Sequence, residues 1–233
     1  MEYAKDLSGG KILDAATGYG CFIKVLAKAF KDYDEIIGID LDPKRIENIE
    51  EDSKLENVSF RPMSLDKLEF EDNYFDTVAI RFSVHHLTNI DHALSEMKRV
   101  LKPGGLFIIC EMYRDNLNQK QRNSANLHHW WAEVDKLRNV PHYPTLLRHE
   151  LISHFEFLEL NSTEYLDYTF PIPENGDSPE DDEELDKIFE QYIEIIRQYP
   201  GHEDLIEKGK QILTAAKNSG MQEPPMLIMF GRK

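Results

Sequence analysis

ILDAATGYG (Ile12–Gly20) is the stretch that decides the fold of this chain of 233 residues. Two apolar residues, an aspartate, small residues and two glycines predict a buried strand that turns tightly into a helix over Cys21–Phe30. The apolar face of that helix is made of Phe22, Val25, Leu26 and Ala29. Gly18 and Gly20 permit backbone conformations and close approaches that a side chain would prevent. Since the free N–H groups of the helix start face the space above the turn, the stretch predicts a ligand cradle, although such turns also serve as packing devices.

A second apolar segment, Glu35–Asp40 (EIIGID), ends in an acidic residue twenty positions after Gly20. An acidic side chain at the end of this strand can accept hydrogen bonds from both hydroxyls of an adenosine ribose. Asp40 is therefore the strongest single candidate for a binding residue. Asp42 and Pro43 have a structural explanation of their own, as the N-cap and the first residue of the next helix.

These features resemble the class I S-adenosylmethionine (SAM)-dependent methyltransferases, in the broad group that includes the quinone-biosynthesis methyltransferases. The family turn reads roughly D-x-G-x-G-x-G. Its positions are occupied here by Asp14, Ala16, Gly18 and Gly20, so that alanine replaces the first glycine. The nicotinamide pattern G-x-G-x-x-G fits less well. The resemblance implies an α/β Rossmann-like fold, with a seven-stranded, mostly parallel sheet, helices on both faces, and SAM as cofactor.

Further cofactor contacts are implied after the third and fourth strands. The segment 61–70 (RPMSLDKLEF) resembles the family segment that grips adenine, with Ser64 in place of the usual acid; Asp66 is close enough to take the polar role. The backbone at Arg81 and Phe82 is expected to face the methionine part of the cofactor, because ligands bind at the carboxyl ends of parallel strands. The cofactor residues implied are Asp14, Ala16, Gly18, Gly20, Asp40, Leu41, Ser64, Leu65, Arg81 and Phe82.

The catalytic residues are harder to predict, because the methyl donor is already activated and the enzyme mainly positions a nucleophile and excludes water. An acceptor that must lose a proton needs a base. The candidates near the cleft are His85, Glu111, His128 and His129. His85 and His86 belong to an HHL sequence that resembles a family signature after the fourth strand. Their structural alternative is that one packs under the loop and the other caps the following helix.

A metal site is imaginable among residues that lie close together in the sequence, namely His128, His129, Glu133, Asp135, Arg138 and His142. Adjacent residues diverge on a helix, however, and no pair of these histidines has the i, i+4 spacing. We therefore expect no metal, and a solvated face from which one or two groups reach the cleft.

The rest of the chain is expected to form one domain over residues 1–233, with a helical insertion over 174–224 before the last strand. That insertion is interpreted as core, as a lid over the substrate or as a dimer surface. The further elements expected are a helix over 43–54, a strand over 58–60, a strand over 77–80, a helix from Asn89 or Asp91 to Val100, a turn over 101–105, a strand over 106–111, a helix over 118–138, a helix from Thr145, a strand over 155–170, helices over 179–199 and 203–218, and an antiparallel strand over 226–230.

Charge and composition narrow the function classes. The net charge of −16, from 27 basic and 43 acidic residues, speaks against free nucleic acid as a partner. No apolar run approaches the ~20 residues that span a bilayer, and no leader segment is recognised. Cys21 and Cys110 indicate core filling in a reducing compartment. We expect a cytoplasmic monomer or homodimer that does not engage membranes.

The sequence thus predicts methyl transfer from SAM to a small-molecule acceptor. Two other functions compete with it. The first is a non-catalytic SAM-binding regulatory or assembly protein on the same fold, suggested by the departures at Ala16 and Ser64. The second is an NAD-dependent oxidoreductase, which the spacing of the glycines disfavours.

Overall fold

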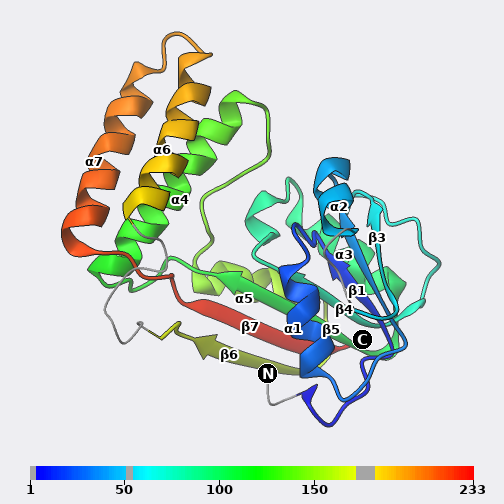
Figure 1. The fold of residues 1–233 in the computed structure, drawn as a ribbon. Coiled ribbons are helices and arrows are strands. Elements are labelled where there is room, and N and C mark those ends of the chain that lie inside the picture. Colours follow the sequence, from blue (N-terminus) through cyan, green and yellow to red (C-terminus); the bar gives the residue numbers. More distant parts are fainter. Residues whose placement is uncertain (1–3, 51–54, 172–181) are drawn as a thin grey trace.

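The computed structural model describes residues 4–50, 55–171 and 182–233. Its seven strands form one sheet in the order β3-β2-β1-β4-β5-β7-β6 (Figure 1). The strands are β1 (Lys11–Ala15), β2 (Glu35–Asp40), β3 (Val58–Pro62), β4 (Phe75–Arg81), β5 (Leu101–Met112), β6 (Asn161–Tyr168) and β7 (Met226–Arg232). Neighbouring strands are parallel, except that β7 is antiparallel to both β5 and β6. The expected Rossmann-like, mostly parallel sheet is therefore confirmed.

Helices cover both faces of this sheet (Figure 1). They are α1 (Cys21–Ala29), α2 (Pro43–Glu50), α3 (Ile90–Val100), α4 (Gln119–Leu137), α5 (Arg148–Glu156), α6 (Asp182–Arg197) and α7 (Glu203–Ser219). Because side chains alternate along a strand, Ile12 and Leu13 of β1 point to opposite faces. Ile12 packs in the cluster that contains Phe22 of α1, whereas Leu13 packs with Leu94 of α3. Apolar burial on both faces fixes the register of the central strands.

The helices α4, α6 and α7 have a core of their own. They stand together beyond one end of the sheet (Figure 1). Trp130 of α4 is fully buried there, and its indole N–H donates to the carbonyl of Leu205 at 2.8 Å. The ring of Trp130 also stacks on Phe189 at a centroid distance of 5.3 Å. Close packing leaves no room for a side chain at Gly209, where a Cβ would lie 2.4 Å from Trp130.

Several expected boundaries and burials are wrong. The strand β5 begins at Leu101 instead of Leu106, because the pairing with β4 jumps from Phe75–Leu101 to Thr77–Leu106 and the expected turn bulges out inside the strand. The helix expected from Thr145 begins at Arg148, and the strand expected over 155–170 is shortened to Asn161–Tyr168. In α1, Ile23 is buried where Val25 was expected, and Cys21 is exposed; only Cys110 fills the core. The expectations for residues 51–54 and 172–181 lie outside the described residues.

The strand order indicates where in the sheet a ligand crevice is expected. It reverses direction between β1 and β4, which are neighbours in the sheet although β2 and β3 lie between them in the sequence. At such a switch point the loops after the two strands diverge and leave a crevice at their carboxyl ends. Residues 16–20 after β1 and residues 82–86 after β4 border it.

Candidate functional site

The turn after β1 uses left-handed backbone conformations repeatedly. The φ angles of Ala16, Gly18 and Gly20 are 52°, 56° and 72°. For an alanine this conformation costs roughly 1–2 kcal/mol, so the turn keeps a strained residue where the family has glycine. A Cβ added to Gly18 would meet no protein atom within 4 Å. The space beside Gly18 is therefore open to a ligand, while α1 begins after Gly20 without a side-chain cap.

Asp40 connects this turn to the end of β2. Its Oδ2 accepts the backbone N–H of Gly18 at 2.9 Å, and its Oδ1 accepts the N–H of Asp42 at 3.0 Å. Each carboxylate oxygen has a further lone pair, so both oxygens can still accept a ribose hydroxyl. Asp40 is 6% exposed, which leaves a narrow approach. The residues around Asp40 thus fit an adenosine ribose.

The buried side chain of Asp14 stabilises the turn through a hydrogen bond. It is 1% exposed, and its Oδ2 accepts the hydroxyl of Thr17 at 2.5 Å. Burial raises the pKa of Asp14 to about 7, against the lowering effects of the Thr17 hydrogen bond and of the Arg81 charge. In the structure this carboxyl contacts the turn, and not the open space above it.

The other residues expected at the cofactor are placed around the same crevice. Leu41 is exposed by 70% and Tyr19 by 69%, so two apolar side chains flank the turn on the surface. The hydroxyl of Ser64 is occupied by Asp66, since it accepts the Asp66 N–H at 3.1 Å. The side chain of Leu65, the next residue, is buried.

The residue that follows β4 has a left-handed backbone conformation, as Ala16 has after β1. Phe82 has a φ of 50°, and its N–H donates to the carbonyl of Cys110 at 2.9 Å. The guanidinium of Arg81 lies 4.2 Å from the centroid of the Phe82 ring. Strained residues at the ends of two adjacent strands are typical of a functional crevice.

A cavity of about 220 Å³ adjoins this crevice. Phe82 and Met112 wall it on the side of the sheet, and α4 and the segment before β7 wall it on the other side. Its lining is Phe82, Met112, Ser124, Ala125, Leu127, His128, Trp131, Thr145, Met221, Glu223 and Pro224. Trp131 also carries the one buried side-chain polar atom without a hydrogen bond among the residues that the structure describes, its Nε1. The cavity therefore joins an apolar wall to a few polar groups, as ligand sites do.

Behind the cavity, three imidazoles lie between two buried carboxylates. Glu111, fully buried, accepts the N–H groups of Val84 at 2.7 Å and Met112 at 2.9 Å, and its Oε1 lies 3.0 Å from Nδ1 of His85. Nε2 of His85 lies 3.2 Å from Nε2 of His128.

The second half of this arrangement comes from α4 and the segment after it. Nε2 of His128 lies 3.1 Å from Nε2 of His142, whose Nδ1 lies 2.8 Å from Oδ2 of Asp135. Burial is the main cause that lowers the pKa of His128 to about 2, and the neighbouring histidines add to it. His128 is thus a neutral imidazole at physiological pH, on the wall of the cavity.

The candidate catalytic residues are only partly brought together. His85, Glu111 and His128 meet as described, and only His128 among them lines the cavity. His129 turns away, and its Nε2 contacts the hydroxyl of Thr145 at 3.0 Å. The structural alternative for His85 and His86 is wrong in one part, because Asn89 caps α3 and Nδ1 of His86 instead contacts the carbonyl of Pro141 at 3.0 Å.

Two residues of this site were not predicted as site residues. The sequence predicts that Asp135 and His142 belong to a solvated face from which one or two groups reach the cleft, whereas the structure buries both. His142 lies in an irregular segment without a hydrophobic period. A usable signal was Glu111, since a carboxylate at the end of a central strand lies beside the loop that follows the neighbouring strand, where His85 is found.

The geometry agrees with comparisons to known proteins. Residues 13–109 match the family model of the methyltransferase domain. The sheet order, the glycine turn and Asp40 agree with this match over residues 13–109, which are similar to the class I SAM-dependent methyltransferases, a class that uses SAM as cofactor.

Three relatives illustrate the likeness. The ubiquinone/menaquinone biosynthesis C-methyltransferase UbiE of Burkholderia mallei is 39% identical over 106 residues, which are 44% of this chain and 43% of that protein. The chain thus matches less than half the length of this curated relative. YcgJ of Bacillus subtilis has the same fold, with a TM-score of 0.62 at 20% identity over 98% of this chain and 94% of that one. Phosphoethanolamine N-methyltransferase 2 of Haemonchus contortus, solved with SAM, has a TM-score of 0.55 at 18% identity over 97% of this chain and 48% of that one.

None of the helices in the described residues is long and apolar enough to cross a membrane.

Proposed function

We propose that this protein transfers a methyl group from SAM to a small-molecule acceptor. The observation that carries the proposal is the position of the cavity, which shares Phe82 with the crevice at the switch point. A cofactor held by the glycine turn and an acceptor held in the cavity would then meet at the end of β4.

The residues that would hold the cofactor are those of the turn and of β2. Asp40 would accept the ribose hydroxyls, and the open backbone at Gly18 would lie against the methionine part. Leu41 and Tyr19 offer apolar surface for the adenine. When bound, SAM supplies an electrophilic methyl group on a sulfonium, so the task of the chain is to align the acceptor and exclude water.

The size and lining of the cavity favour a small acceptor. Its volume of about 220 Å³ lies below the ~300–1,000 Å³ of sites for drug-sized ligands. The buried Nε1 of Trp131 is a donor without a partner. Such a donor favours an acceptor molecule with a carbonyl, carboxylate or hydroxyl oxygen, because an unpaired buried N–H is costly.

Of the candidate catalytic residues, His128 is the one that can touch the acceptor, because it lines the cavity. His85 would act through His128, and Glu111 would orient His85. The C-methylation named for UbiE is a reasonable first reaction to test, although that likeness covers only 44% of this chain.

The test combines binding and turnover. Calorimetry should show SAM binding, and release of S-adenosylhomocysteine should be measured over a panel of phenols, quinols, carboxylic acids and amines. Ala125→Phe, which fills the cavity away from the glycine turn, should keep SAM affinity and abolish turnover. Without SAM binding the proposal fails; SAM binding without turnover on any acceptor would favour the non-catalytic SAM-binding protein.

A further inference from the structure

Two short contacts join the ring nitrogens of three histidines at the inner wall of the cavity. Nε2 of His128 lies 3.2 Å from Nε2 of His85 and 3.1 Å from Nε2 of His142. Zinc–nitrogen bonds of 2.0–2.1 Å in a tetrahedral site place ligand nitrogens about 3.3 Å apart. Both separations are therefore close to the distance between two nitrogen ligands of a tetrahedral zinc ion.

The outer nitrogens of two of these rings are held by buried carboxylates. Oε1 of Glu111 faces Nδ1 of His85 at 3.0 Å, and Oδ2 of Asp135 faces Nδ1 of His142 at 2.8 Å. With Nδ1 of each ring at its carboxylate, the opposite ring nitrogen, Nε2, is the one that faces His128. This carboxylate–histidine arrangement is the one that orients histidine ligands around metal ions.

Hydrogen bonds alone do not satisfy both contacts of His128. Nε2 of His128 has at most one hydrogen, which it can direct to His85 or to His142. The other short contact is then left without a hydrogen bond. A cation between the rings removes this conflict, because each Nε2 can then offer it a lone pair.

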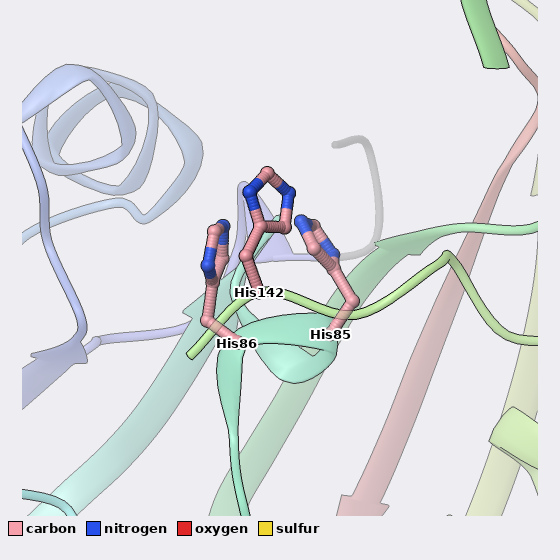
Figure 2. Close-up of side chains that lie close together, drawn as sticks. All are labelled: His85, His86 and His142. Atoms are coloured by element: carbon pink, nitrogen blue, oxygen red, sulfur yellow. The ribbon is translucent and has the colours of Figure 1, made fainter. Parts of the chain in front are cut away.

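We propose that His85, His128 and His142 bind a divalent transition-metal ion of the Zn²⁺ type. His86 stands beside them: in Figure 2 its ring and that of His85 flank the ring of His142, and one ring nitrogen from each of these three residues lies within 4.8 Å of the others. The imidazole nitrogens suit zinc, cobalt, nickel or copper better than magnesium or calcium, which prefer oxygen. Since His128 also lines the cavity, the ion lies at the cavity wall, where a fourth position can take water or a ligand oxygen.

The proposal departs from the sequence expectation of no metal. That expectation looked for ligands along one helix, whereas here they come from the loop after β4, from α4 and from the segment after α4. The proposal does not depend on methyl transfer, because a non-catalytic SAM-binding protein would carry the same ion.

Metal binding by the purified full chain tests the proposal. Protein stripped with a chelator is titrated with Co²⁺ and with Zn²⁺, in competition with a chromophoric chelator, and its metal content is measured by mass spectrometry. We expect one ion per chain, with the intense visible absorption of four-coordinate Co²⁺. His128→Ala and His142→Ala should each lose the stoichiometric ion, whereas His129→Ala, a change at the adjacent residue of the same helix, should retain it.

A change at a residue that is not itself a proposed metal ligand distinguishes weaker metal binding from misfolding. Asp135→Asn should weaken binding by about 10–100-fold, as loss of an outer carboxylate does, while circular dichroism stays native. The proposal is overturned if the wild-type protein binds neither ion against the chelator, or if His128→Ala and His142→Ala bind it like the wild type. A protein that stays metal-free but methylates an acceptor would refute the metal site and keep the proposed function.

Discussion

The carboxylate of Asp40 holds the turn that carries Gly18: the Gly18 N–H donates to Oδ2 of Asp40 at 2.9 Å, although 22 residues separate the two in sequence. The residue expected to bind the ribose and the turn expected to cradle the cofactor are thus parts of one hydrogen-bonded unit. A change at Asp40 would therefore act on the expected ligand contact and on the shape of the turn together.

Asp40→Ala should weaken SAM binding by roughly 2–3 kcal/mol, because hydrogen bonds to a charged carboxylate are lost. Asp40→Asn should be milder, since its amide oxygen keeps one acceptor. Calorimetry measures both affinities, and Asp34→Asn, an exposed change just before β2, serves as the control. An unchanged affinity in folded Asp40→Ala would remove Asp40 from the binding site.

Gly18→Val should abolish SAM binding while the far-UV circular dichroism stays largely native. A Cβ at Gly18 meets no protein atom within 4 Å, so the obstruction falls on the ligand, and the positive φ of 56° adds a backbone strain that the control must share. Gly104→Val is the matched control, because Gly104 also has a positive φ, of 77°, and open space at its Cβ, but lies in the β5 bulge. If both variants bind SAM equally well, the turn is not the cradle.

Asp14→Asn should flatten the pH dependence of stability. In the folded protein burial raises the pKa of Asp14 from its ordinary value of 3.8 to about 7. The native state therefore holds a proton that the unfolded chain releases, and stability contributed at this site falls as pH rises from about 4 to 7.

A shift of this size corresponds to a change on the order of 4 kcal/mol across that window. Denaturant unfolding of the wild type and of Asp14→Asn at pH 4 and pH 7 measures it, with Asp34→Asn as the surface control. Parallel pH profiles for the wild type and Asp14→Asn would show that Asp14 is ionised in the native protein.

The helices α6 and α7 should behave as a mobile unit beside the site, although none of the residues that line the cavity belongs to them. Their apolar side chains pack around Trp130 of α4 in a cluster separate from the two clusters of the sheet, so they can open without disturbing the sheet. Hydrogen exchange of residues 182–219 should show weak protection that rises with S-adenosylhomocysteine, while Ile36–Ile39 stays protected.

The variant Gly209→Ala tests, in the same hydrogen-exchange experiment, whether α7 is held by its packing on Trp130. The new Cβ would lie 2.4 Å from Trp130, so protection of α7 should fall further while that of β2 is unchanged. Strong protection of α6 and α7 with and without ligand would instead indicate a fixed core element or a dimer surface.

The sequence predicted those parts of the molecule whose signals are local. The strand β2 shows an apolar run with a terminal carboxylate, and the turn at Gly18 shows its glycines, so both were placed correctly. The start of β5 was missed because a bulge depends on pairing with β4, which no local pattern records. His142 was missed for the same reason, since only the folded chain brings it to His128.

The two halves of the chain contribute different parts of the candidate site. The family likeness covers residues 13–109, which contain the glycine turn and Asp40, whereas most of the cavity wall comes from α4 and from the segment before β7. Under the proposed function, changes in the second half of the chain would alter the acceptor while the half that would hold the cofactor is inherited intact. A chimera that joins residues up to the end of β5 to the second half of another family member would be the corresponding engineering experiment.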